Sequence, residues 1–99
     1  MNNGKSSYCR FLEGERDAII DVVKEYNSGL VLYLNTITGS ICVSEEIAED
    51  VFCELMLKRP DFREKSNFKT WLYAIARHLA LKMMKKYRNL DTMPVDEHY

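Results

Sequence analysis

Apolar residues recur every three or four positions along three stretches of this chain, which is the spacing of one face of an α-helix. In the most regular stretch, from Phe68 to Arg88, they stand at positions 68, 71, 72, 75, 76, 79 and 83. A stretch that starts near residues 15–17 carries Ile19, Val23, Tyr26, Leu30, Tyr33, Leu34 and Ile37, and another carries Ile47, Ala48, Val51, Phe52 and Leu55. No strand-like alternation of any length is present. The pattern predicts an all-α domain, a compact three-helix bundle, and leaves open a short extra helix at Phe11 and Leu12.

Capping residues predict where the second of these helices begins and ends. Ser44 can cap it, with Glu45 and Glu46 in the first turn. The helix must end before Pro60, because the residue that precedes a proline is disfavoured in the α region.

The other two helices have their own boundary residues. Gly39 is a natural end for the first helix, and Asn67 or Ser66 can cap the third. Gly29 lies inside the first helix and costs about 1 kcal/mol relative to alanine. The pattern therefore leaves open a break near residues 27–29.

The chain of 99 residues is long enough for one domain with a modest core. We expect residues 1–9 to be a disordered or frayed N-terminus, residues 10–90 to be the folded domain, and residues 91–99 to be a tail or the start of a linker. No run approaches the roughly 20 apolar residues that span a bilayer, and the polar N-terminus lacks the apolar run of a signal peptide. Three irregularly spaced cysteines argue against a disulfide framework and favour a reducing cytoplasm.

The net charge of −1 conceals a strong separation of charge along the chain. Residues 1–57 carry a net charge of −6, residues 58–90 carry +8, and the last nine residues carry −3. This asymmetry indicates two surfaces with different partners. The alternative is that each charged group only solvates its own helix.

The outward side of the second helix forms an acidic face with a small apolar centre. It consists of Glu46, Glu49, Asp50, Cys53, Glu54 and Leu57. Such a face can dock a basic or mixed helix, and the plain alternative is a solvated surface.

The third helix carries basic and aromatic groups beside its apolar stripe. Trp71, His78, Lys82 and Lys85 fall on one flank, and Lys69, Tyr73 and Arg77 fall on the opposite flank and outer face. A tryptophan beside basic side chains suits unstacked bases, because stacking tolerates any sequence and contributes about 1–3 kcal/mol per base. The alternatives are that Trp71 is a core anchor with an exposed edge and that His78 is an ordinary surface histidine.

Three segments of the chain together resemble region 2 of an extracytoplasmic-function (ECF) sigma factor of bacterial RNA polymerase. They are Arg-Phe-Leu-Glu-Gly at 10–14, Ala-Glu-Asp-Val-Phe-Cys-Glu-Leu at 48–55 and Phe-Lys-Thr-Trp-Leu-Tyr-Ala-Ile-Ala-Arg at 68–77. The second is similar to the acidic helix of that family, and the third to its F-x-x-W-L-Y-x-I-A-R signature. The resemblance covers roughly residues 8–88.

The resemblance implies that the acidic helix grips the clamp helices of the largest catalytic subunit of core RNA polymerase. Asp50 and Glu54 hold the matching positions, with Glu46, Glu49 and Leu57 nearby. Cys53 stands where the family usually has glutamine, so the amide of that residue is missing from the grip.

The resemblance also implies that the loop before the third helix captures a base flipped from the non-template strand of the minus-ten promoter element, while the third helix holds the opened strand. The residues that would line the loop are Arg63, Glu64, Lys65, Ser66, Asn67 and Phe68. His78 and Lys82 differ from the usual family residues at their positions, so the base preference of the family is not carried over. Lys69, Arg77, Lys85 and Lys86 are better interpreted as phosphate contacts, which position the strand without specifying its sequence.

The function implied by this resemblance is that of a sigma factor domain in transcription initiation: it docks on the polymerase and recognises and melts the minus-ten element. The expected partners are core RNA polymerase and promoter DNA, with an anti-sigma factor left open and no membrane. Full-length members carry a further helical domain, region 4, and the chain ends where the linker to it would begin. An excised domain is therefore favoured over a natural single-domain relative.

Catalytic functions have little support in the sequence. A glycine-rich phosphate loop and a Cys-x-x-Cys pair are absent, and His78 and His98 are twenty residues apart. We therefore expect no enzymatic activity, no metal and no cofactor. The remaining alternative is a helical module that reads duplex DNA or binds another protein. The proline-containing connection over residues 58–67 argues against a helix-turn-helix.

Overall fold

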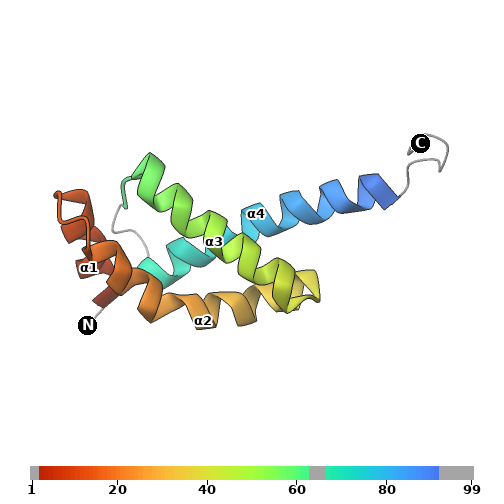
Figure 1. Cartoon of the computed structure of the whole chain (residues 1–99), viewed down its shortest axis with the longest axis horizontal. Coiled ribbons are helices and arrows are strands. Elements are labelled where there is room, and N and C mark those ends of the chain that lie inside the picture. The colour runs from red at the N-terminus through yellow and green to blue at the C-terminus, as the bar shows by residue number, and fades with distance from the viewer. Residues whose placement is uncertain (1–2, 63–66, 92–99) are drawn as a thin grey trace.

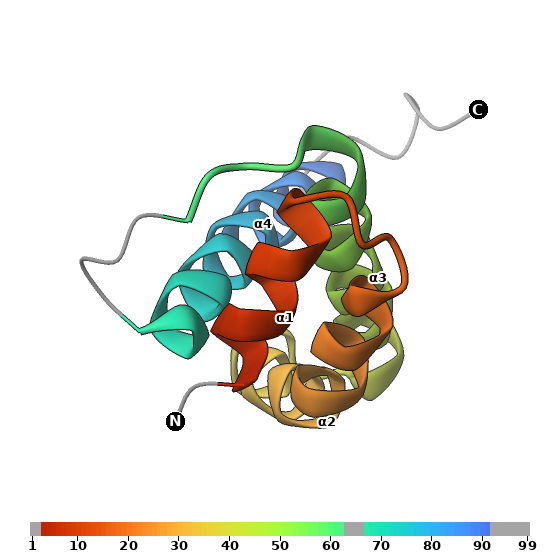
Figure 2. The same cartoon turned by 90° about the vertical axis from the view of Figure 1, so that its left-hand side faces the viewer.

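The computed structural model describes residues 3–62 and 67–91, and all regular structure in these two ranges is helical. The helices are α1 (Asn3–Leu12), α2 (Ala18–Thr38), α3 (Ile41–Lys58) and α4 (Phe68–Asp91). α2 and α3 form an antiparallel pair against which α4 packs, and the C-terminal half of α4 extends beyond them (Figure 1). α1 lies at the opposite end of the bundle, against α2 and α4 (Figure 2). The all-α prediction is confirmed, with α1 as the extra helix.

The buried faces of α3 and α4 follow the predicted stripes closely, whereas in α2 Val22 and Val31 are buried and were not predicted. In α3 all five predicted core residues, Ile47, Ala48, Val51, Phe52 and Leu55, are buried. In α4 the buried positions are Phe68, Leu72, Ala76 and Ala80, while Trp71, Ile75, Leu79 and Met83 are partly buried around them. This spacing turns one side of α4 into the core and leaves its basic side chains outside.

α2 is continuous, so the break near residues 27–29 that the sequence left open does not occur. Gly29 lies at a contact with α4, because a Cβ atom added to it would lie 2.7 Å from the hydroxyl oxygen of Tyr73. Gly29 therefore makes room for a side chain and does not interrupt the helix. α2 ends as predicted at Gly39, which has φ 72° and donates its N–H to the carbonyl of Asn35.

α3 begins one turn earlier than the sequence indicated. Its N-cap is Ser40, whose hydroxyl oxygen accepts a hydrogen bond of 3.2 Å from the N–H of Val43. Ser44, the predicted cap, is fully buried in the first turns of the helix, with its hydroxyl 2.8 Å from that of Thr38. The prediction failed because two serines four residues apart both suit a cap.

The other end of α3 is joined to α1. Arg59 ends the helix in the left-handed conformation, with φ 46°, directly before Pro60. Its guanidinium donates hydrogen bonds of 2.8 and 2.9 Å to the carbonyls of Phe11 and Leu12, the last residues of α1. The hydroxyl of Tyr8 donates to the carbonyl of Pro60. The start of the α3–α4 connection is thus held by α1.

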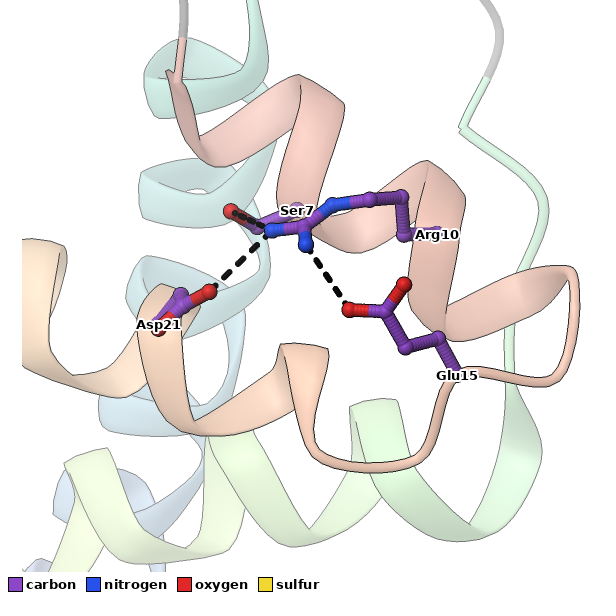
Figure 3. A network of polar contacts seen from close by, with 4 residues as sticks. All are labelled: Ser7, Arg10, Glu15 and Asp21. Carbon is purple, nitrogen blue, oxygen red and sulfur yellow. Dashed lines mark hydrogen bonds and ion pairs between the residues drawn. The ribbon is translucent and has the colours of Figure 1, made fainter.

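The expectation that residues 1–9 are frayed does not hold for residues 3–9, which belong to α1. Tyr8, Phe11 and Leu12 have the i, i+3, i+4 spacing of a helix face, and Tyr8 is fully buried. Arg10 holds α1 to the following residues through Glu15 at 2.7 Å and Asp21 at 3.1 Å, and also contacts Ser7 (Figure 3). Of the predicted C-terminal segment 91–99, Asp91 ends α4 and residues 92–99 lie outside the described residues.

Candidate functional site

The six residues of the predicted acidic face all lie on the side of α3 that points away from the core. Glu46, Glu49, Asp50, Cys53 and Leu57 are exposed, and Glu54 is half-buried at the edge of the face. Their spacing places them opposite the buried stripe from Ile47 to Leu55. The result is a carboxylate-rich helix surface that ends in a leucine.

An apolar patch at the C-terminal end of this face was not predicted from the sequence. Leu57 is 82% exposed, and it is joined by Met56 and by Ile20 of α2, each about half exposed. The three side chains line a hollow together with Arg16 and Arg59. Ile20 belongs to a different helix from the other two, so only the packing of α2 on α3 shows that the patch exists.

The two predicted surfaces meet at a groove between α3 and α4. The groove has a volume of about 570 Å³ and is lined by Glu54, Lys58, Trp71, Ala74, Ile75, His78, Leu79 and Lys82. It brings Trp71, His78 and Lys82 of the α4 flank beside Glu54 of the acidic face. Glu54 accepts a hydrogen bond of 3.1 Å from Lys58 one turn along α3. This groove combines an aromatic edge, an apolar floor and groups of both charges.

Trp71 serves both the core and the groove. Its ring centroid lies 5.4 Å from that of Tyr8, 5.2 Å from Phe62 and 5.5 Å from Phe68. The indole is only partly buried, because its remaining edge lines the groove. The two interpretations of Trp71, core anchor and stacking surface, are therefore compatible.

Asn67 and Phe68, which the sequence placed together in one DNA-binding loop, have different surroundings at the start of α4. Phe68 is fully buried among the aromatic rings, so its side chain supports Trp71 and is not available to stack on a base. Asn67 is exposed and caps α4, since its side-chain oxygen accepts a hydrogen bond of 2.8 Å from the N–H of Thr70. Arg63, Glu64, Lys65 and Ser66, also predicted for this loop, lie outside the described residues.

The opposite flank of α4 forms a second, separate hollow against α2. It is lined by Tyr33, Lys69, Thr70, Tyr73 and Ala74. The rings of Tyr33 and Tyr73 lie 4.9 Å apart, and the ammonium of Lys69 lies 5.4 Å from the centroid of Tyr73. Burial, and then the neighbouring Tyr33, raise the pKa of Tyr73. The sequence did not predict that Tyr33 lies beside this flank, because its position belongs to the apolar stripe of α2.

The remaining basic residues of α4 are exposed along its outer side and C-terminal half. Arg77 follows Tyr73 by one turn, and Lys85 and Lys86 lie further along the helix. Lys86 and Lys82 also line a small apolar depression with Asp50 of α3. No acidic residue occurs between positions 68 and 90, so all charged side chains of α4 from Phe68 to Arg88 except the titratable His78 are cationic.

These features define an all-helical domain with an acidic helix face and a basic, aromatic helix face that share one groove. A sequence model of Sigma-70 region 2 matches residues 22–89, which include most of α2, all of α3 and nearly all of α4. The chain therefore belongs to the Sigma-70 region 2 family. α1 lies before the matched range.

Two curated proteins of Bacillus subtilis (strain 168) are similar to the chain. One is named RNA polymerase sigma factor YlaC and is 30% identical over 71 residues, which cover 72% of this chain and 41% of the relative. The other is named ECF RNA polymerase sigma factor SigW and is 28% identical over 74 residues, covering 75% of this chain and 40% of the relative. The chain thus matches about two fifths of the length of each. No solved structure gave a significant match.

In the described residues Cys9, Cys42 and Cys53 are free thiols. None of the helices described here is long and apolar enough to cross a membrane.

Proposed function

We propose that this domain acts in bacterial transcription initiation, where it docks on core RNA polymerase through α3 and captures unpaired bases of the minus-ten promoter element through α4. The observation that carries the proposal is the groove at which the two faces meet, on helices that the Sigma-70 region 2 match covers. The printed names of the two relatives, both sigma factors of RNA polymerase, support the same function.

The docking half of the proposal rests on the outward face of α3. Asp50 and Glu54 would meet basic residues of the clamp helices, with Glu46 and Glu49 extending the negative surface. Leu57, which is 82% exposed, would be covered by the partner. Cys53 lies in the centre of the face, where a small, weakly polar side chain allows close approach.

The DNA half of the proposal rests on the N-terminal half of α4. The exposed edge of Trp71 would support an unstacked base, while His78 and Lys82 lie along the same groove as hydrogen-bonding groups. Lys69, Arg77, Lys85 and Lys86 would hold phosphates along the helix. From the preceding loop, Arg63, Lys65, Ser66 and Asn67 are the expected contacts with a flipped base.

This function requires no bond to be made or broken by the domain. Extruding a base from a duplex costs a few kcal/mol, which is comparable to one stacking contact of about 1–3 kcal/mol together with a hydrogen bond. The domain alone is therefore expected to bind duplex DNA poorly and single strands weakly. Melting would depend on the polymerase, which bends and strains the duplex while the domain captures bases.

A pull-down of bacterial core RNA polymerase tests the docking half directly. The parent chain is compared with an Asp50→Arg/Glu54→Arg variant and with a Glu13→Arg/Glu25→Arg variant, which makes the same change of charge at exposed positions outside α3. We expect the parent and the control to retain the polymerase and the first variant to lose it. Equal retention by all three, or tight salt-insensitive binding of duplex DNA by the chain alone, would contradict the proposal.

A further inference from the structure

The hollow between α2 and α4 is a second surface feature of the basic helix, distinct from the groove beside α3. It is lined by Tyr33, Lys69, Thr70, Tyr73 and Ala74. Ala74 also lines the α3–α4 groove, so the two depressions share one small, exposed residue as their boundary. Ala74 is therefore the point at which an extended ligand that occupies both depressions would cross α4.

The rings of Tyr33 and Tyr73 pack against each other in this hollow, and Tyr73 packs on α2 at a glycine. The ring of Tyr73 lies 4.9 Å from that of Tyr33, with 32° between the ring planes. The hydroxyl of Tyr73 reaches the backbone of α2 where Gly29 leaves no Cβ atom in its way. A glycine inside a helix lowers helix stability, so the close packing of Tyr73 on α2 compensates for an unfavourable residue. The pair is thus a preorganised aromatic surface.

The charges around the pair favour an anionic ligand. The ammonium of Lys69 lies 5.4 Å from the ring centroid of Tyr73, and Arg77 is exposed one turn further along α4. Between positions 68 and 90 the helix carries no carboxylate that would repel an anion. A flat group attached to a phosphate satisfies both the rings and the cations, and an unpaired nucleotide is such a ligand.

We propose that the hollow binds one unpaired nucleotide of a single DNA strand, with the base against the Tyr33–Tyr73 pair and its phosphate at Lys69, and that the strand crosses α4 at Ala74. Tyr33 thereby becomes a contact residue contributed by α2. The identity of the strand as promoter DNA rests on the proposed function. The hollow itself requires only a single strand, so it is tested without polymerase.

The competing explanation is that Tyr33 and Tyr73 only pack α2 against α4. The two explanations differ for the variants Tyr33→Phe and Tyr33→Leu. Both substitutions keep an apolar side chain between the helices, but only phenylalanine keeps a ring on which a base can stack. If Tyr33 only packs the helices, the two variants should have similar affinities for a single strand. If a base stacks on Tyr33, the Tyr33→Leu variant should bind the strand more weakly than the Tyr33→Phe variant.

The test measures binding of a fluorescein-labelled ten-nucleotide oligo-dT to the 99-residue chain at low salt, by fluorescence anisotropy. We expect Tyr33→Phe to bind within twofold of the parent and Tyr33→Leu to bind at least about fivefold more weakly, which is the lower end of the range for one lost stacking contact. Tyr87→Leu, which removes an exposed tyrosine on the extended part of α4, should leave the affinity unchanged. Circular dichroism confirms that each variant is folded.

A second variant covers the case in which Tyr33→Leu is poorly folded. Ala74→Glu places a carboxylate at the crossing point on an exposed position, and we expect at least fivefold weaker binding. Affinities within twofold of the parent for folded Tyr33→Leu or for Ala74→Glu would overturn the proposal. So would the absence of binding by the parent at millimolar protein. Failure of the polymerase pull-down would not alter these results, because no polymerase is present in this assay.

Discussion

The guanidinium of Arg59 contacts Phe11 in two ways, through the backbone carbonyl of Phe11 and through its aromatic ring. The guanidinium of Arg59 donates a hydrogen bond of 2.8 Å to the carbonyl of Phe11 and also lies 4.5 Å from the centroid of the Phe11 ring. The pair connects the last turn of α1 to the end of the acidic helix α3. α1, which precedes the matched family range, therefore helps to fix where α3 ends and the connection to α4 begins.

Replacing Arg59 by alanine should destabilise the domain. The variant loses charge-assisted hydrogen bonds to the carbonyls of Phe11 and Leu12, at a cost of about 1–2 kcal/mol in the free energy of unfolding. Urea unfolding followed by circular dichroism measures the difference. Lys24→Ala, at an exposed position of α2, serves as the control and should change stability by no more than about 0.5 kcal/mol. An equal effect of both substitutions would mean that the contact between α1 and α3 contributes nothing.

Tyr8 should make the stability of the domain depend on pH at high pH. Burial, as the main cause, raises the pKa of Tyr8 to about 12 from its usual value of 10. The stability that protonated Tyr8 contributes to the free energy of unfolding is fully present below pH 10. It is lost as the pH rises from 10 to 12, because in this range the hydroxyl is ionised in the unfolded chain but still largely protonated in the folded one. At pH 11 the loss amounts to about 1.4 kcal/mol.

The Tyr8→Phe variant isolates this effect. It lacks the hydroxyl that donates to Pro60, so it should be less stable than the parent at pH 8, by about 0.5–1.5 kcal/mol. Between pH 9 and pH 11 its stability should fall less than that of the parent, since all other titrating groups are shared. Parallel pH profiles for the two proteins would show that Tyr8 does not titrate differently in the folded and unfolded states.

Gly29 and Tyr73 should be energetically coupled. In the Tyr73→Phe background, Gly29→Ala should stabilise the domain by about 1 kcal/mol, the usual gain in helix propensity. In the parent the same substitution should give less stability or destabilise the domain, because the new Cβ atom would lie 2.7 Å from the hydroxyl of Tyr73. A double-mutant cycle in urea measures the coupling. A coupling energy near zero would mean that the ring of Tyr73 moves aside freely.

Trp71, the only tryptophan of the chain, should report single-strand binding in the α3–α4 groove. We expect a base stacked on its exposed edge to quench its fluorescence, and duplex DNA to do so much less. Replacing Lys82 by glutamine should weaken single-strand binding, because Lys82 lines the groove beside Trp71. Replacing Lys85, one of the proposed phosphate contacts, by glutamine should make the slope of log affinity against log salt shallower by about 0.7, the value for one phosphate contact. Lys24→Gln should leave the slope unchanged. Quenching that does not depend on Lys82 would place the strand elsewhere on α4.

The parts of this protein that could be predicted from its sequence are those that depend on near neighbours in the chain. The buried stripe of α3 from Ile47 to Leu55 follows from helical spacing, and the end of α2 at Gly39 follows from the left-handed conformation that glycine adopts easily. The acidic and basic faces follow from the same periodicity. The family, too, could be inferred from short segments of local sequence.

The start of α3 shows where this approach fails. Ser40 and Ser44 are equally good caps by residue type, and the sequence around each is compatible with a helix start. Ser40 is the cap because the chain turns there, which buries Ser44 and allows its hydroxyl to meet Thr38. α1 was left open by the sequence for a similar reason, since three apolar residues in one short segment do not establish a helix until the aromatic core that buries Tyr8 is known.

The sequence by itself determined the class of fold, the buried faces of α3 and α4 and the separation of acidic from basic surfaces, because each of these depends on the period of the helix. Tertiary structure alone decided that Gly29 lies under Tyr73, that Tyr33 joins the basic helix, and that Glu54 faces Trp71 across a groove. These pairs are far apart in the chain. Their contacts depend on where the helices cross, and the crossing is set by the packing of the whole core.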